Sequence, residues 1–227
     1  MSGIGGLNEW ELHESLKQLY AGADGRTELE IDGFVVDVAR DDELVEIQTR
    51  GLGKLRRKIE ALCPSHRLRI VYPIAVETTI TRLSGGGELQ GTRRSPRRGR
   101  VEEVFSELTS IADLLPHERV TVEVVLVRAV ETRIDDGRGS WRRRGVSIVA
   151  RQLGAVVSTH ELREAADYLA LLPAGLGRQF TNRDLVEAGG LRYRFAQPMT
   201  SALRKMGLLR VCEPRGRERV YEPAAPS

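Results

Sequence analysis

The sequence contains only two cysteines, Cys63 and Cys212, among its 227 residues. They lie in unrelated segments without metal-ligand spacing, which excludes a disulfide framework and is typical of reduced thiols in a cytoplasmic protein. No apolar run approaches the length that crosses a bilayer, and the opening residues MSGIGGLNEWE lack the pattern of a signal peptide. We therefore expect a cytoplasmic protein that does not enter the membrane.

Motifs of several enzyme classes are also missing. The sequence has no Cys-x-x-Cys pair and no Ser/His/Asp arrangement, and the glycine run at 84–87 is not followed by the Lys-Ser or Lys-Thr of a P-loop. The formal net charge is only +3, so the clustering of arginines carries more information than the overall field. The length is sufficient for one large domain or two small domains with hydrophobic cores.

Residues 31–50, IDGFVVDVARDDELVEIQTR, are the most informative stretch. An Asp-Gly pair, the strongest two-residue hairpin signal, leads into a predicted β-strand at 34–39. A polar turn then separates it from a second predicted strand at 44–49, in which side chains alternate between two faces.

Carboxylates on these strands predict a metal site. Asp37 lies within a β-branched apolar run, whereas Glu46 and Gln48 share one face of the second strand. Charges on a sheet face are costly unless paired or coordinated, and two carboxylates with an amide oxygen suit a hard cation such as Mg²⁺. The alternative is that Asp37 pairs with Arg40 or a sheet neighbour, and that Glu46 and Gln48 line a solvated face.

A helix is predicted before these strands, over residues 7–20. Its apolar stripe consists of three leucines, Leu12, Leu16 and Leu19. A second stripe lies immediately beside it and consists of Glu9, His13, Lys17 and Tyr20. Glu9 is therefore the helical acid best placed to face the strands, although Glu9 and His13 could instead form an exposed pair one turn apart.

The pattern Asp37, then Glu46-Ile47-Gln48, resembles the core of the PD-(D/E)xK nuclease superfamily, in which an Asp precedes a Glu-x-Lys strand. The resemblance covers about residues 7–75. It implies a nuclease in which Asp37 and Glu46 hold Mg²⁺ or Mn²⁺, completed by the Ile47 carbonyl and by Glu9 from the first helix.

Gln48 departs from the superfamily, which usually has Lys at this position. An amide can orient the attacking water or reach the metal, but it cannot carry charge or act as a base. Lys17 or Lys54 could supply the missing cation, although neither stands at the superfamily position.

The order of the predicted elements agrees with the resemblance. A helix at 51–62 joins the strand at 44–49 to an apolar strand at 68–74, and such a crossover predicts that the two strands run parallel. A further strand is predicted at 27–31, and the resulting order, α-β-β-β-α-β, is the one that the resemblance implies. A helix over 101–115 and a long strand over 119–134 are predicted to follow.

Arginines gather in two predicted loops. The first, at 84–100, contains Arg93, Arg94, Arg97, Arg98 and Arg100. Guanidinium groups so close together repel one another unless an anion such as a phosphate backbone lies between them; the alternative is a solvated basic loop. The second loop, at 135–145, contains Trp141 beside Arg142 and Arg143, where the ring could stack on a base or pack on its own arginines.

The predicted pattern changes at 153–158, which we interpret as a domain boundary. Three helices are predicted beyond it, at 159–172, 181–190 and about 196–206, and a β-hairpin follows. This order resembles a winged helix-turn-helix, with the third helix as recognition helix. The predicted contacts to DNA are polar residues of that helix and of the wing: Arg194, Thr200, Arg204, Lys205, Arg215, Arg217 and Arg219.

The sequence therefore predicts an α/β protein with a mixed-sheet, restriction-endonuclease-like core at 1–154 and a winged helix-turn-helix domain at 155–227. The whole chain resembles an uncharacterised bacterial family with this layout. The expected function is metal-dependent cleavage of phosphodiester bonds in DNA. The alternatives are a non-catalytic DNA-binding or regulatory protein that keeps the nuclease-like fold, and a module that docks a protein partner. RNA as the substrate and a homodimeric state both remain open.

Overall fold

The structure, a computed structural model, describes residues 7–224, and describes side chains from residue 11 onward. The chain is a mixed α/β protein that divides into two compact units, each assembled from three segments. The sheet unit consists of Met1–Thr49, Val71–Arg100 and Val124–His160. The helical unit consists of Arg50–Ile70, Val101–Glu123 and Glu161–Ser227.

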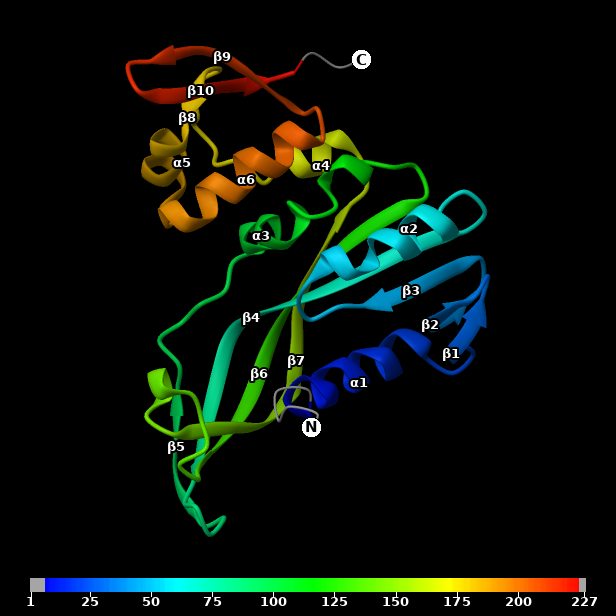
Figure 1. Ribbon diagram of the computed structural model, residues 1–227, viewed down its shortest axis with the longest axis vertical. Helices are drawn as coiled ribbons and strands as arrows, with labels where there is room; N and C mark the ends of the chain where they lie inside the picture. The colour runs from blue at the N-terminus through cyan, green and yellow to red at the C-terminus, as the bar shows by residue number, and fades with distance from the viewer. Residues whose placement is uncertain (1–6, 225–227) are drawn as a thin grey trace. The chain divides into compact units, whose positions relative to one another are not determined.

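A seven-stranded sheet has the strand order β1-β2-β3-β4-β6-β7, with β5 paired to β4 (Figure 1). Its strands are β1 Arg26–Ile31, β2 Phe34–Arg40, β3 Glu43–Ile47, β4 Arg67–Leu83, β5 Leu89–Arg94, β6 Val120–Asp135 and β7 Val146–Leu162. The first three strands form an antiparallel meander. The chain then passes through η1 (Leu52–Leu55) and α2 (Arg56–Leu62), and Figure 1 shows β4 running in the same direction as β3, as the crossover predicts.

The turn between β1 and β2 confirms the Asp-Gly signal. Asp32 and Gly33 both have positive φ, 49° and 80°, which is the requirement of the two-residue turn whose twist matches that of the strands. Leu29 consequently pairs with Val36, and the side chains of β2 alternate between buried and partly exposed.

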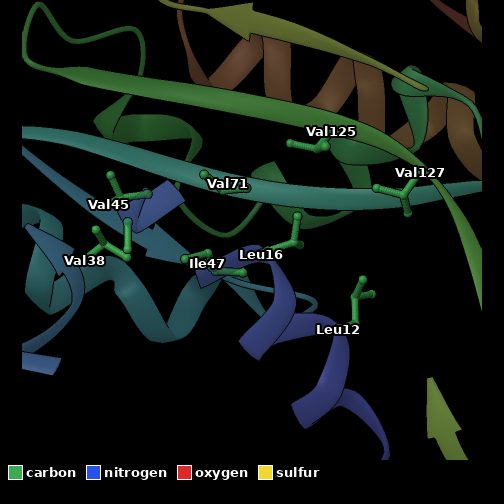
Figure 2. Close-up of a cluster of buried hydrophobic side chains, with 9 residues drawn as sticks. Leu12, Leu16, Val38, Val45, Ile47, Val71, Val125 and Val127 are labelled. Carbon is green, nitrogen blue, oxygen red and sulfur yellow. The ribbon is translucent and has the colours of Figure 1, made fainter. Parts of the chain in front are cut away.

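Helix α1 (Leu7–Ala21) packs on this meander through an apolar cluster that includes Leu12, Leu16, Val38, Val45, Ile47, Val71, Val125 and Val127 (Figure 2). The prediction for Leu19 is wrong, because 54% of that residue is exposed. Lys17 and Ala21 are buried instead. At 100° per residue, the buried arc of the helix is therefore centred near His13, and Leu12 lies at its edge. The helix faces the sheet largely with the stripe that the sequence marks as polar.

The predicted helix over 101–115 is broken into three short pieces. These are η2 Val101–Val104, α3 Phe105–Leu108 and η3 Ala112–Leu114. The Thr109 hydroxyl donates to the Ser106 carbonyl and the Ser110 hydroxyl to the Glu107 carbonyl. Such local hydrogen bonds compete with the helical ladder and explain why the helix does not continue.

The predicted helix over 159–172 is also wrong in its first half. Strand β7 continues to Leu162, so the predicted boundary at 154 lies inside a strand, and the compact units divide the chain differently from 1–154 and 155–227. The helix that follows, α4, covers only Ala165–Leu169. Glu164 and Asp167 form the capping box at its start. A capping box needs an acid or amide three residues after the first cap residue, and the residue three positions after Thr159 is Leu162.

The rest of the helical unit agrees closely with the prediction. Helix α5 (Asn182–Gly189) begins at a capping box between Thr181 and Asp184, and α6 (Tyr193–Lys205) ends before Gly207, whose φ is 76°. Pro198 lies inside α6 and not in its first turn, because the helix begins three residues earlier than predicted. A three-stranded sheet, in the order β8-β10-β9, completes this part with β8 Phe180–Thr181, β9 Leu209–Arg215 and β10 Glu218–Pro223 (Figure 1). No helix within residues 7–224 has the length and apolarity to cross a membrane.

A buried ion cluster in the sheet unit makes stability depend on pH. Glu131 is 4% exposed and accepts hydrogen bonds from Arg151 at 2.9 Å and from Arg133 at 2.6 Å. Burial alone raises the pKa of Glu131, but the bonds from the two arginines outweigh it and lower the pKa below its ordinary value. The ionised carboxylate therefore stabilises the fold above its unfolded-state pKa, and this contribution is lost as the pH falls through the lowered value.

We expect Glu131→Gln to lower the free energy of unfolding by about 1.5–3 kcal/mol at pH 7, the range for hydrogen bonds to charged groups. Urea unfolding of both proteins at pH 7 and at pH 3.5 measures the effect. The difference between wild type and variant should shrink at the lower pH, because the Glu131 carboxylate of the unfolded chain is then largely protonated and its ionisation on folding opposes the gain. An equal difference at both pH values would contradict the role of the charge.

Candidate metal site and nucleic-acid interface

Asp37 lies where β2 and β3 stop pairing regularly. The last regular cross-strand pairs include Val38 with Val45, and beyond them the Asp37 carboxylate replaces a backbone acceptor. Its Oδ2 accepts the N–H of Ile47 at 2.8 Å, which places the carboxylate at the peptide bond between Glu46 and Ile47. The structure thus places the Asp37 carboxylate against the backbone that joins Glu46 to Ile47.

His13 is a residue of this site that the sequence prediction does not include. Its Nε2 lies 3.3 Å from Asp37 Oδ2. The hydrogen bond with Asp37 raises the pKa of His13 above its ordinary value, although burial opposes it. The sequence contains a signal for this placement, because His13 belongs to the same stripe of α1 as Glu9. His13 is partly buried and lies against Asp37 of β2.

Glu46 is 4% exposed, and a carboxylate so deeply buried requires hydrogen bonds or a cation to remain ionised. Gln48 follows it at the end of β3, where its backbone N–H donates to the Val71 carbonyl at 2.9 Å. Within the described residues, no three His, Cys, Asp or Glu side chains form a group that could hold a metal. Mg²⁺ usually keeps several waters and binds one or two carboxylates together with substrate phosphates, so a site for this ion needs fewer than three such side chains.

Lys17 and Glu9 are the two other residues predicted for this site, and the structure describes the side chain of Lys17 only. The ammonium of Lys17 is buried and lies 2.7 Å from Glu14 and 2.8 Å from Glu28, contacts that raise its pKa. These ion pairs account for Lys17 as a structural residue that holds α1 to β1. Glu9 lies in the first turns of α1, but its side chain is outside the described residues.

The arginines of the first predicted loop lie on and after β5. Arg93 pairs with Ile80 and Arg94 with Thr79 across the β4–β5 hairpin, so this part is a strand and not a loop. Arg98 lies beyond the strand and donates to the Ser95 carbonyl at 2.6 Å. The five predicted arginines, Arg93, Arg94, Arg97, Arg98 and Arg100, are all exposed, and in the sheet unit they form a basic edge.

The second predicted loop is the tip of the β6–β7 hairpin. Trp141 begins a short 3₁₀ turn, η4 (Trp141–Arg143), and is 82% exposed. The guanidinium carbon of Arg142 lies 5.5 Å from the centroid of the indole ring. Both alternatives that the sequence left open are thus compatible with the geometry: the ring contacts its own arginine and still presents a large free surface.

A polar hollow of about 440 Å³ opens in the helical unit between the start of α5, one face of α6 and the β9–β10 hairpin. Its lining contains four arginines, one carboxylate and several neutral polar side chains. These residues are Thr181, Asn182, Arg183, Tyr193, Gln197, Thr200, Ser201, Arg204, Arg217, Glu218, Arg219 and Tyr221.

Helix α6 has two distinct faces. The residues of α6 in the hollow recur at intervals of three or four: Tyr193, Gln197, Thr200, Ser201 and Arg204. The opposite face is buried in the core of the unit by Ala196, Met199, Ala202 and Leu203. The Thr200 hydroxyl donates to Asn182 Oδ1 at 2.8 Å, which fixes α6 against the start of α5. The outward face is therefore held in place by a packed core.

The predicted interface residues divide between the hollow and other surfaces. Four of them line the hollow: Thr200, Arg204, Arg217 and Arg219. Three others have different contacts. Arg194 lies over the ring of Phe195, Lys205 donates to the Thr109 carbonyl at 2.7 Å, and Arg215 lies 3.4 Å from Asp184. The prediction missed Asn182 and Arg183, whose position depends on the packing of α5 on α6 and not on any local pattern.

Comparisons with known proteins place the chain among relatives of undetermined function. It is 32% identical over 225 residues to an uncharacterized protein of Treponema pallidum (strain Nichols), and the match covers 98% of this chain and 88% of that relative. No solved structure matches the chain. Residues 10–163 match the family described as a domain of unknown function, DUF8091, and that match ends one residue beyond β7. The chain therefore belongs to the DUF8091 family.

Proposed function

We propose that the protein binds DNA through the hollow between α5, α6 and the β9–β10 hairpin. The observation that carries this proposal is the lining of the hollow, in which four arginines face a single carboxylate, Glu218. Arginine is the side chain best suited to phosphate, because its planar fork donates two hydrogen bonds at once. The neutral polar side chains of α6 in the same hollow are of the type that reads base edges.

The order of elements supports the same function. Helices α4, α5 and α6, the short β8 and the β9–β10 hairpin follow one another as in the winged helix-turn-helix that the sequence resembles. In that arrangement α6 is the recognition helix and the β9–β10 hairpin is the wing. Gln197 and Ser201, one turn apart on the outward face of α6, are then the base-contacting candidates, and Arg217 and Arg219 contact the phosphates.

Fluorescence anisotropy with a labelled DNA duplex tests this proposal. We expect Arg204→Ala and Arg217→Ala each to weaken binding about 10-fold, the scale of one charge-assisted contact. The matched control is Arg163→Ala, since this exposed arginine is paired with Glu161 outside the hollow. Equal losses in all three variants would indicate a general charge effect, and no binding by the wild type would favour a protein-docking role.

Metal-dependent cleavage of the bound DNA is a second candidate function, and the arrangement at Asp37 favours it. The carboxylate lies at the Glu46–Ile47 peptide bond, in an element order α1-β1-β2-β3-α2-β4 that agrees with the nuclease resemblance. A bound Mg²⁺ would lower the pKa of a water molecule and stabilise charge on the scissile phosphate. Asp37 and Glu46 would hold the ion, and Gln48 would orient water by hydrogen bonding.

A further inference from the structure

The tip of the β6–β7 hairpin combines an exposed aromatic ring with a high density of positive charge. Trp141 is 82% exposed, an unusual state for the largest apolar side chain. The loop at 135–145 contains four arginines, Arg138, Arg142, Arg143 and Arg144, and two acids, Asp135 and Asp136, at its start. The Asp136 carboxylate accepts hydrogen bonds from the Arg138 N–H and the Ser147 hydroxyl. The charged residues nearest to Trp141 in sequence are all cations, and this combination suits an aromatic ligand that carries negative charge.

The exposure of Trp141 is a property of an ordered turn. The Gly139 N–H donates to the Gly145 carbonyl at 2.8 Å, and the Arg144 N–H donates to the Trp141 carbonyl at 3.0 Å. A Cβ added at Gly139 would lie 1.9 Å from the carbonyl oxygen of Val146, so only glycine fits there. The backbone on both sides of the indole is therefore held in one conformation, and this backbone loses little conformational entropy when a ligand stacks on the ring.

The chemistry of the tip selects one class of nucleotide. The guanidinium carbon of Arg142 lies 5.5 Å over one face of the indole ring, which leaves the other face for a base, and the positive charge next to the ring favours the adjoining phosphate. In a continuous duplex, the faces of each base are covered by the neighbouring base pairs. An aromatic side chain therefore finds a free base face only where a base is unpaired.

We propose that Trp141 and its arginines bind an unpaired nucleotide, and that DNA with a single-stranded segment, such as an overhang or a branch, is the preferred ligand. This inference rests on the proposed DNA binding and adds the substrate class. It involves the sheet unit, whereas the hollow belongs to the helical unit, so variants can separate the two sites.

Intrinsic fluorescence tests the proposal directly. Trp10 and Trp141 are the two tryptophans of the chain, so Trp10→Phe leaves Trp141 as the only indole reporter; circular dichroism checks that the fold is retained. The protein is titrated with a 12-nucleotide single strand, a blunt duplex, and the same duplex with an overhang. We expect quenching by the single strand and the overhang, and much less by the blunt duplex.

Affinities measured with labelled DNA complete the test. Trp141→Ala should weaken binding to the overhang about 5- to 150-fold, the range for loss of one stacked base, and should leave blunt-duplex binding nearly unchanged. Trp141→Phe should recover most of the loss. The control is Leu19→Ala, which removes an exposed apolar side chain on α1 of the same unit.

Three outcomes would overturn the proposal. Equal losses of Trp141→Ala on blunt and overhanging duplex would remove the preference for unpaired bases while leaving DNA binding intact. No response to any nucleic acid would contradict both the preference for unpaired bases and the proposed DNA binding. A blue shift of the Trp141 emission with anionic phosphatidylglycerol vesicles, without quenching by DNA, would assign the tip to a lipid surface.

Discussion

Asp37→Ala and Glu46→Ala are each expected to lower metal-dependent nicking of supercoiled plasmid at least about 100-fold, the scale on which loss of one electrostatic stabiliser reduces catalysis. The reason is that Asp37 and Glu46 are the two carboxylates proposed to hold the ion. Removal of either carboxylate leaves a single acid for the ion. The assay compares Mg²⁺, Mn²⁺ and EDTA, with plasmid and with a branched oligonucleotide.

Asp37→Asn is the matched variant that separates chemistry from folding. Its amide oxygen can still accept the Ile47 N–H, so the end of the β2–β3 pairing is preserved while the charge is lost. We expect it to unfold like the wild type and to nick no better than Asp37→Ala. Nicking that persists in EDTA, or that survives in Asp37→Asn, would contradict metal-dependent cleavage at this site. DNA binding without nicking in either metal would favour the non-catalytic alternative.

The first seventy-five residues could be predicted well because their signals are local. The Asp-Gly turn and the crossover through α2 are properties of short segments, and the structure has both. The predicted alternation of β3 is wrong as a burial pattern, because consecutive residues from Leu44 to Ile47 are all buried. The prediction fails at Leu19 because an apolar stripe marks a face of the helix but not the centre of the buried arc. That centre is set by what the sheet presents to the helix, namely Asp37 to His13 and Glu28 to Lys17.

The middle of the chain could not be predicted equally well because its structure depends on distant partners. Residues 153–162 combine small, β-branched and polar side chains that suit a turn or a helix start, and the pairing of β7 in the sheet makes them a strand. Long strands also explain the interleaved units: the divisions at 70/71 and 123/124 lie within β4 and β6. No pattern in a short segment of sequence indicates that the chain passes from one compact unit to the other within a strand.

The interface residues show the same contrast. Arg204, Arg217 and Arg219 could be identified as surface cations from helix and hairpin positions alone, and they line the hollow. Lys205 is adjacent to Arg204 in sequence, but a rotation of 100° along α6 directs it to the Thr109 carbonyl. Residue type and position therefore predict which cations lie on the surface, whereas the packing of each helix and hairpin decides which of them line the same hollow.

The affinity for duplex DNA is expected to fall about 40- to 150-fold between 50 and 200 mM NaCl. For each phosphate neutralised, log K falls by about 0.9 per tenfold increase in salt concentration, and the hollow offers three to four arginines. The lower figure counts Arg204, Arg217 and Arg219, which line the hollow. The higher figure adds Arg183, whose guanidinium already lies 3.1 Å from Glu187 and must exchange that partner for a phosphate.

The slope of this salt dependence identifies which unit contacts the phosphates. Arg217→Ala should reduce the slope by about 0.9 with a blunt duplex, and Glu218→Gln should tighten binding, because the only carboxylate of the hollow is then neutral. A slope well above four would mean that arginines of the sheet unit also contact the DNA. Combined replacement of Arg93 and Arg94 should then lower the slope, and the same replacement should leave it unchanged if the hollow acts alone.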